Sequence, residues 1–213
     1  MRHKRGLVIV MSGFSGAGKG TIVKHLFDTY PDSYFLSISA TTRNPRPGEQ
    51  DGREYFFKTK EEFESMIENK ELLEYANFNG NYYGTPKAYV EKLVNEGKDV
   101  ILEIEVQGAL QVRDIFPEAL LLFVTPPSAQ ALEKRLVGRG TETADVVAQR
   151  LAISARESHL MNKYDYLIVN DTVEDSVKEV HGIIESEHYR TSRNEEAINK
   201  IQEELKVFAK GDK

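Results

Sequence analysis

A chain of 213 residues with a formal net charge of −6 and no cysteine excludes several classes of protein. Disulfides and cysteine metal sites are ruled out, and the acidic balance argues against nonspecific binding to a nucleic-acid polymer. No apolar run approaches the roughly 18 residues of a membrane span. With 40% hydrophobic and 29% charged residues, we expect one soluble, cytoplasmic core with small insertions.

Short apolar runs with many β-branched residues recur along the chain, and this composition is typical of strands buried on both faces. The runs are Leu7–Met11, Tyr34–Ile38, Val100–Ile104, Leu120–Val124 and Tyr166–Val169. Apolar residues at helical spacing follow the first run, precede the third and follow the fifth. Strands that alternate with helices favour right-handed crossovers. We therefore predict an α/β fold with a doubly wound, five-stranded parallel sheet.

Residues 39–85 interrupt this alternation, because they are polar and rich in proline and glycine. A short helical stretch, Glu61–Ile67, lies there between two aromatic, strand-like pieces. These pieces are Tyr55–Lys58 and Leu72–Phe78. We predict a small mixed subdomain inserted into a core that is made of residues 1–38 and 86–190.

Two later segments also depart from the sheet pattern. The polar stretch Gly138–Asp145 joins two helical segments and predicts a mobile lid over about residues 138–150. In the tail, residues 191–213, apolar side chains recur at the helical spacing of Ile198, Ile201, Leu205 and Phe208. This stripe predicts a helix that packs either on its own core or on a second copy of the chain, as a homo-oligomer.

A glycine-rich loop lies between the first predicted strand and the first predicted helix. It follows the pattern Gly-x-x-x-x-Gly-Lys, with the residues Gly13, Phe14, Ser15, Gly16, Ala17, Gly18 and Lys19. Glycines let successive backbone N–H groups point at one centre, and the helix N-terminus adds partial positive charge. The lysine supplies a mobile charge for the β- and γ-phosphates of a nucleotide such as ATP.

The end of this loop departs from the general pattern. Gly20 occupies the position that is usually Ser or Thr, and Thr21 follows one residue later. The Thr21 hydroxyl is therefore displaced, and it contacts either the metal or a phosphate. A glycine-rich turn without a ligand is the alternative interpretation, which the flanking strand and helix disfavour.

Five motifs, in order along residues 6–187, resemble those of guanylate kinases. They are Ser39–Glu49 with Gly52 and Tyr55, Gly80–Thr85, Leu102–Gly108, Arg135 with Gly138–Thr143 and Arg150, and Ile168–Asp171. The sequence Gly-Lys-Gly-Thr likewise resembles the phosphate loop of small nucleotide kinases. The resemblance implies a P-loop NTPase-type core and transfer of the γ-phosphoryl group of ATP to GMP with Mg²⁺, within purine metabolism.

By this resemblance, two arginines and two tyrosines hold the phosphate of GMP. They are Arg43, Arg46, Tyr55 and Tyr83. Planar guanidinium groups in a loop stiffened by proline suit a phosphate monoester, and tyrosine hydroxyls can donate to the same group. Taken alone, the loop also fits a solvated basic surface.

The resemblance assigns recognition of guanine to Ser39, Glu74 and Thr85. A carboxylate can accept from guanine N1–H and N2–H₂, whereas hydroxyls can donate to O6. Adenine would place a lone pair against Glu74, and sites built on such pairing discriminate by ~10⁴-fold. Taken alone, Glu74 also fits the outward charge of a strand.

Two carboxylates, Glu103 and Glu105, end the predicted strand Val100–Ile104. In a phosphate-loop fold this strand end lies beside the nucleotide. The resemblance implies that Glu103 acts on the metal side, through the water shell of Mg²⁺, and that Glu105 approaches guanine. The family often has Asp at the position of Glu105, so its contact stays open.

Lid arginines complete the predicted catalytic set with Lys19 and Arg43. By resemblance they are Arg135, Arg139 and Arg150, while Asn170 lies on the adenine side. Positioned arginines stabilise the spread charge of a transferring phosphoryl group. Any one of them alone also fits a helix-surface charge.

Two other functions stay open at this point. The first is a kinase on the same scaffold that acts on AMP, a pyrimidine nucleotide or a phosphorylated sugar, and a panel of acceptors would identify it. The second is a protein-binding module without catalysis, which a measurement of ATP binding would identify. Ser39, Glu74 and Thr85 favour guanine, and the intact phosphate loop favours an enzyme.

Overall fold

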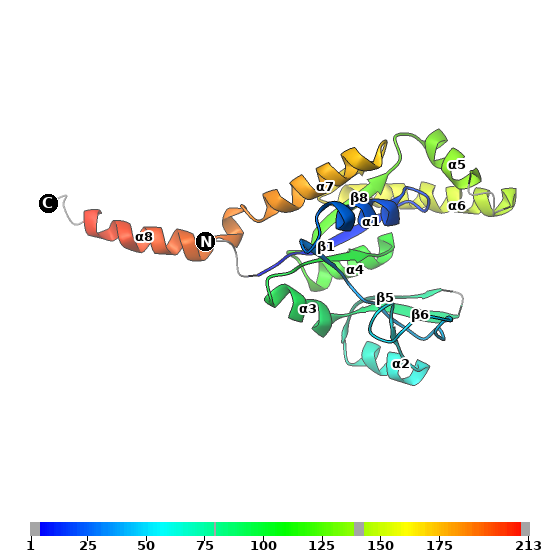
Figure 1. Ribbon diagram of the computed structural model, residues 1–213, viewed down its shortest axis with the longest axis horizontal. Coiled ribbons are helices and arrows are strands. Elements are labelled where there is room, and N and C mark those ends of the chain that lie inside the picture. The colour runs from blue at the N-terminus through cyan, green and yellow to red at the C-terminus, as the bar shows by residue number, and fades with distance from the viewer. Residues whose placement is uncertain (1–4, 79, 139–142, 210–213) are drawn as a thin grey trace.

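The computed structural model describes residues 5–78, 80–138 and 143–209 (Figure 1). Its core is a five-stranded sheet in the order β2-β7-β1-β8-β9, and every adjacent pair is parallel. The strands are β1 (Val8–Gly13), β2 (Tyr34–Leu36), β7 (Asp99–Glu103), β8 (Leu120–Thr125) and β9 (Tyr166–Val169). The predicted parallel sheet is therefore confirmed.

Helices cover both faces of this sheet, which explains the continuous apolar strands. Along β1, Ile9 and Met11 pack into one apolar cluster with α1 (Lys19–Thr29) and α7 (Val173–Glu187). Val8 and Val10 point the other way, into a cluster with α3 (Lys87–Asn95) and α4 (Val106–Ile115). Since neighbouring strand residues face opposite sides, both sets are withdrawn from water.

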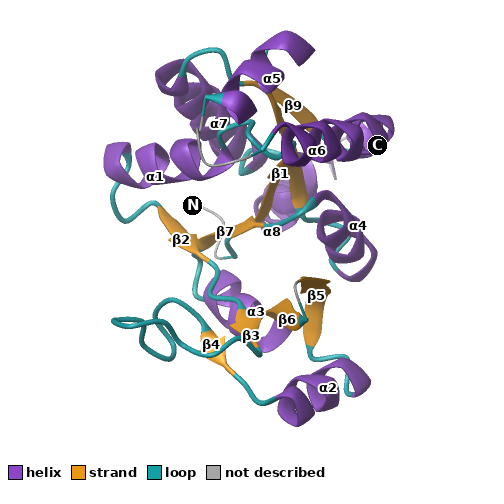
Figure 2. Ribbon diagram, turned by 90° about the vertical axis from the view of Figure 1, so that its right-hand side faces the viewer, coloured by secondary structure: helices purple, strands orange, loops and turns teal. Residues whose placement is uncertain are grey.

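The inserted segment forms a second, mixed sheet in the order β4-β3-β6-β5. Its strands are β3 (Ala40–Thr41), β4 (Phe56–Phe57), β5 (Leu72–Phe78) and β6 (Asn81–Pro86). Helix α2 (Lys60–Glu68) begins at a capping box between Thr59 and Glu62, and its Phe63 is fully buried in a small core of its own. Figure 2 shows this sheet set apart from the large one.

Several element boundaries differ from the sequence prediction. Strand β2 ends at Leu36, and β7 ends at Glu103 rather than at Ile104. Glu105 is the residue that precedes α4, a helix that the sequence analysis did not predict. Strand β6 was also not predicted, because Asn81, Gly84 and Pro86 are residues typical of turns.

Helix α5 (Ala129–Val137) ends just before the predicted lid of about residues 138–150, and α6 (Ala144–Glu157) begins within it. Arg139 and the rest of 139–142 lie outside the described residues, so the mobility of the lid stays a prediction. The 3₁₀ turns η1 (Ser158–Lys163) and η2 (Thr191–Arg193) complete the chain, with α8 (Glu195–Ala209) after η2. No helix in the described ranges is long and apolar enough to cross a membrane.

The tail forms the predicted helix, but its apolar stripe does not pack on its own core. Figure 1 shows α8 extending away from the body of the molecule. The side chains of Ile201, Leu205 and Phe208 are 56%, 56% and 78% exposed. Of the two alternatives for this stripe, packing on the core of the same copy is wrong.

Candidate active site

The loop between β1 and α1 has a backbone conformation that requires glycine. Gly13, Gly16 and Gly18 have φ angles of 144°, 91° and 95°, which L side chains rarely adopt. A Cβ atom on Gly13 would lie 2.0 Å from the carbonyl oxygen of Val124. Helix α1 begins without a side-chain cap or an acidic residue in its first turn. Its N-terminal N–H groups are thus available for an anion.

Lys19 lies over this loop rather than in solvent. Its Nζ atom donates to the carbonyl oxygen of Gly13 at 2.7 Å, and its side chain is half-buried. The ammonium group is therefore held at the mouth of the loop, where a nucleotide's terminal phosphates would meet it.

Helices α5 and α6 each contribute an arginine that contacts the phosphate loop. Arg135 of α5 donates to the carbonyl oxygens of Ala17 at 3.2 Å and of Asn170 at 2.8 Å. Arg150 of α6 donates to the Ser15 hydroxyl at 3.2 Å. The structure thus brings two predicted arginines onto the loop from separate helices.

Asn170 connects the loop to α7. Its side chain is buried, and its Nδ2 atom donates to the carbonyl oxygen of Ala17 at 2.8 Å. Ser176 of α7 donates to its Oδ1 atom at 3.2 Å. The sequence analysis missed Ser176, because no motif marks it. The side-chain amide of Asn170 supports the loop, so the predicted adenine contact stays untested.

Glu103 lies against the start of α1. A Cβ atom on Gly20 would come within 3.3 Å of its Oε1 atom, so any larger residue at position 20 would crowd the carboxylate. Although the side chain keeps contact with solvent, partial burial raises the pKa of Glu103, while nearby Lys19 opposes that shift. Thr21, one residue further along, is exposed.

A divalent cation could be held here only with help from a ligand. Within the described residues, no group of three or more His, Cys, Asp or Glu side chains could bind a metal ion. Glu103 offers one carboxylate beside the loop. Magnesium suits such a place, because it is usually bound by one or two carboxylates, by water and by substrate phosphates.

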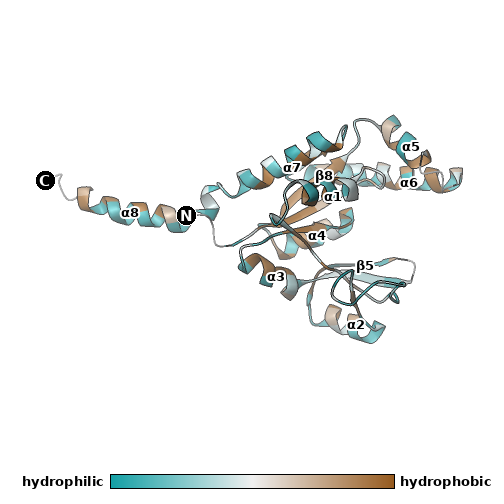
Figure 3. Cartoon of the chain, viewed as in Figure 1, coloured by the Kyte–Doolittle hydropathy of each residue, from teal (hydrophilic) through white to brown (hydrophobic). Residues whose placement is uncertain are grey.

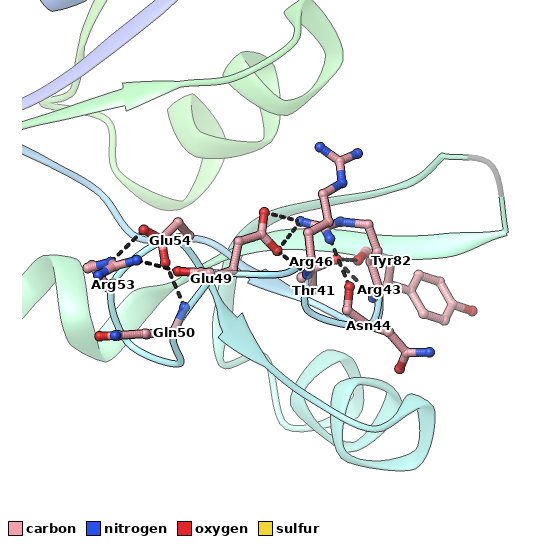
Figure 4. Close-up of polar contacts among 10 residues, drawn as sticks. Thr41, Arg43, Asn44, Arg46, Glu49, Gln50, Arg53, Glu54 and Tyr82 are labelled. Atoms are coloured by element: carbon pink, nitrogen blue, oxygen red, sulfur yellow. Dashed lines mark hydrogen bonds and ion pairs between the residues drawn. The ribbon is translucent and has the colours of Figure 1, made fainter.

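On the small sheet, Arg43 is held by a carboxylate that the sequence analysis left without a role. Its Nη2 atom lies 3.0 Å from both carboxylate oxygens of Glu49, whose Oε2 atom also accepts from the backbone N–H of Arg46 (Figure 4). The arginine lowers the pKa of Glu49, and the carboxylate raises the pKa of Arg43. A carboxylate within an arginine-rich loop indicates that such a pair can form, but the sequence does not show which of the charges will pair.

Two aromatic rings lie next to this ion pair. The guanidinium carbon of Arg43 is 5.4 Å from the ring centre of Tyr55, and the rings of Tyr55 and Tyr83 meet edge to face at 6.1 Å. Three of the four predicted phosphate-binding side chains are therefore neighbours, and Arg46 belongs to the same loop.

A buried polar pair connects this sheet to the core. Thr85 is fully buried, and its hydroxyl donates to Glu74 Oε1 at 2.6 Å. Burial raises the pKa of Glu74, although the hydrogen bond from Thr85 opposes that shift. A Cβ atom on Gly108 of α4 would lie 2.8 Å from Glu74 Oε2, so only glycine leaves room for the carboxylate there.

The remaining predicted guanine contacts lie at the edges of this area. Ser39 precedes β3 and is partly exposed, and its carbonyl oxygen accepts from Phe56 N at 2.9 Å. Glu105 is exposed at the N-terminus of α4, where its side chain caps no N–H group. Gln111 of α4, which the sequence analysis missed, bonds to both backbone polar groups of Tyr75 and fixes β5 against the core.

The site thus consists of two groups, one on each sheet. Among the described residues, no hydrogen bond or ion pair joins Lys19 or Arg135 to Arg43 or Arg46. A phosphate loop at the carboxyl end of a parallel sheet, with a second cationic site on an inserted subdomain, defines a P-loop nucleotide-binding protein of the phosphotransferase class.

Comparisons with known proteins identify the family within this class. The guanylate kinase family model matches residues 5–187. The chain is 55% identical to the guanylate kinase of Bacillus anthracis, over 91% of this chain and 94% of the relative. It is 51% identical to that of Lactococcus lactis subsp. lactis (strain IL1403), over 96% and 100%. The chain belongs to the guanylate kinase family.

A solved structure agrees with this assignment. The crystal structure of guanylate kinase from Anaplasma phagocytophilum matches with a TM-score of 0.69 and 30% identity, covering 90% of this chain and 91% of that one. The predicted family and fold class are therefore confirmed.

Proposed function

We propose that this chain transfers the γ-phosphoryl group of ATP to GMP, which gives ADP and GDP. The buried Glu74–Thr85 pair, which accompanies an intact phosphate loop, is the observation that carries this proposal. The loop recognises polyphosphate through its backbone, and the pair supplies an anionic acceptor beside a hydroxyl group. Guanine is the common base whose two adjacent N–H donors match that acceptor.

The acceptor nucleotide binds on the small sheet. Its phosphate contacts Arg43, Arg46, Tyr55 and Tyr83, and its base contacts Ser39, Glu74, Thr85 and Glu105. Arg43 exchanges Glu49 for the phosphate dianion, which also offers two acceptor oxygens and carries a greater charge.

ATP binds on the large sheet, along residues 13–21, with Asn170 on the adenine side. A nonbridging oxygen of the GMP phosphate attacks the γ-phosphorus, and the bond to the β–γ bridging oxygen breaks as ADP leaves. The attacking phosphate is largely ionised near neutral pH, because its second pKa is ~6. The transfer therefore needs no strong general base.

Cations around the loop stabilise the charge that spreads over the transferring group. Lys19, Arg135 and Arg150 already lie on the loop, and Arg139 would join them from the lid. Closure of the lid and of the small sheet excludes water, which would otherwise accept the phosphoryl group.

The metal that accompanies ATP is Mg²⁺ in this proposal. Bound magnesium would neutralise phosphate charge and orient the polyphosphate. Glu103 would hold its water shell, and the exposed Thr21 hydroxyl would contact either the ion or a phosphate. We place the reaction in the cytoplasm and in purine nucleotide metabolism.

An acceptor screen with ATP and Mg²⁺ tests this function. GMP, AMP, UMP, CMP and a phosphorylated sugar are offered separately, and formation of ADP and of the product is followed. GDP from GMP, far above any other product, supports the proposal. Preferred turnover of another acceptor would make the chain a different kinase, and failure to bind ATP would make it a binding module.

A further inference from the structure

A cavity of about 350 Å³ lies at the end of the large sheet opposite the phosphate loop. It is bounded by Leu120 at the start of β8, by Asp165 just before β9, and by η2. The phosphate loop follows the carboxyl end of β1, whereas this cavity lies at the amino ends of the parallel strands. Figure 3 shows the junction between α7 and α8, which forms one wall, in hydrophilic colours. A cavity of this size suits a small ligand.

Seven charged side chains line the cavity, and six of them are matched in pairs. The pairs are Arg5 with Glu118, Arg113 with Asp165, and Arg190 with Glu187. Asp165 also accepts from the backbone N–H of Leu121 at 2.8 Å. Glu187 also accepts from the hydroxyl of Tyr166 at 3.0 Å. Each carboxylate therefore has its own arginine, and two of the three have a further donor.

Arg193 is the seventh charge, and no carboxylate is left for it. Within the described ranges it forms no ion pair, and its Nη2 atom donates only to the carbonyl oxygen of Glu118, at 3.0 Å. Its side chain is partly buried, and this burial lowers the pKa of Arg193 although Glu187 and Glu118 oppose the shift. A partly desolvated cation without a counterion is unfavourable. The cavity thus has a surplus positive charge in a chain whose net charge is −6.

Arg113 has a donor to spare in the same cavity. Its Nη1 atom donates to the carbonyl oxygen of Pro117, and its Nη2 atom donates to Asp165. Its Nε–H group is buried without an acceptor among the described residues. A buried N–H group that lacks an acceptor costs free energy, which a ligand with acceptor oxygens would recover.

We propose that this cavity binds a compact anion of the phosphate class, which Arg193 and Arg113 hold. Guanidinium groups match the oxygen atoms of phosphate in geometry and charge. Phosphate fits better than a carboxylate, because a carboxylate has only two oxygens whereas phosphate has enough acceptors for two arginines at once. The anion is either free inorganic phosphate or the phosphate group of a small ester. It connects η2 to α4 and therefore stabilises the fold.

This anion site is separate from the candidate active site. None of the residues proposed to bind ATP, GMP or Mg²⁺ lines the cavity. Binding there should not compete with either nucleotide, and a failure of the proposed reaction would not affect this inference.

Arginine side-chain NMR tests the site, with the Arg113 Nε–H signal as a local reporter. Because phosphate would also enter the active site, the protein is first saturated with a nonhydrolysable ATP analogue, Mg²⁺ and GMP. Inorganic phosphate and glycerol 3-phosphate are then titrated separately, with chloride added to keep the ionic strength constant. We expect a saturable shift at millimolar concentration, and the tighter ligand of the two identifies the source of the anion. No saturable shift with either ligand up to about 50 mM overturns the proposal.

A matched pair of variants tests the role of the surplus charge. Arg193→Gln should raise Kd for the bound phosphate by about 10-fold or more, because a charge-assisted hydrogen bond becomes a neutral one. Arg156→Gln removes an exposed arginine of α6 outside the cavity and should leave Kd unchanged. Arg193→Lys keeps the charge and should bind more tightly than Arg193→Gln. Thermal melts and unchanged GMP turnover verify that the variants are folded. Equal weakening by Arg193→Gln and Arg156→Gln would overturn the proposal, since only the net charge would then matter.

Discussion

The phosphate loop and the small sheet both carry cations that bind a phosphate in our proposal, but they are built differently. In the loop, three glycines with positive φ angles and a buried strand fix the backbone before any ligand arrives. On the small sheet, Arg43 is held by the side chain of Glu49, a partner that a ligand must displace. In our proposal, the donor site is therefore formed by backbone geometry, and the acceptor site by an ion pair that the ligand exchanges.

The largest effect should come from removing the lysine of the loop. Lys19→Ala eliminates the ammonium group that contacts the terminal phosphates in our proposal, and we expect kcat to fall by about 10³-fold or more. The backbone conformation depends on glycines, so circular dichroism and the melting temperature should be nearly unchanged. Lys24→Ala, an exposed lysine of the same helix, is the control and should retain full turnover.

Near-normal turnover by Lys19→Ala would contradict the assignment of the phosphate loop as the donor site. The loop would then not be the site at which the phosphoryl group is transferred.

A smaller effect is expected when the anionic acceptor of the small sheet is neutralised without loss of volume. Glu74→Gln should lower kcat/KM for GMP by about 10- to 100-fold, because a hydrogen bond to a charged group becomes one to a neutral group. KM for ATP should not change, and discrimination between GMP and AMP should decrease. Glu68→Gln, exposed on α2, is the control. If Glu74→Gln impaired the use of ATP as much as the use of GMP, Glu74 would stabilise the fold and would not recognise guanine.

Arg43→Lys should have a still smaller effect, about 10-fold in KM for GMP. Lysine keeps the charge but loses the planar guanidinium group, whose Nη2 atom contacts both oxygens of Glu49 and whose Nη1 atom donates to the carbonyl oxygen of Asn44. Steady-state kinetics at saturating ATP would measure this change. Arg53 forms an exposed pair with Glu54 in the same loop, so Arg53→Lys is the matched control. Equal effects of the two substitutions would mean that the loop acts only through its total charge.

The smallest expected effect is on the free energy of unfolding of the core that carries the phosphate loop. His188 Nε2 lies 2.8 Å from Asp99 Oδ2, and this hydrogen bond raises the pKa of His188 more than burial lowers it. Protonated His188 therefore stabilises the folded state fully below pH ~6.5, its unfolded pKa, and this contribution is lost as pH rises through the folded pKa.

Urea unfolding of the wild type and of His188→Gln at several pH values would test this contribution. The difference between their free energies of unfolding should be largest near pH 5.5 and should shrink by pH 8. A difference that grows with pH would contradict the assignment.

Much of the core could be predicted from the sequence, because its signals are local. Runs such as Leu120–Val124 are apolar on both faces, and the loop from Gly13 to Lys19 has a fixed spacing, so both follow from neighbouring residues. Helix α4 was missed although Val106, Ala109 and Val112 are buried at helical spacing. Gly108 within it lowers helix propensity, and the structure indicates why glycine stands there: Glu74 occupies the space.

The acceptor side was less predictable, because its contacts join residues that are distant in the chain. Glu74 meets Thr85 across two strands and meets Gly108 on another element, and neither contact follows from spacing. Only the resemblance to a family suggested a role for Glu74. The Arg43–Glu49 pair is local, but the sequence does not show which charges of a polar loop will pair.

Crossed calorimetric titrations test most directly the claim that the loop holds the donor and the small sheet holds the acceptor. A nonhydrolysable ATP analogue with Mg²⁺, and separately GMP, are titrated into Lys19→Ala and into Glu74→Gln. We predict that Lys19→Ala loses affinity for the ATP analogue but binds GMP like the wild type, and that Glu74→Gln shows the reverse. If either variant loses affinity for both ligands equally, the loop and the small sheet are not separate donor and acceptor sites.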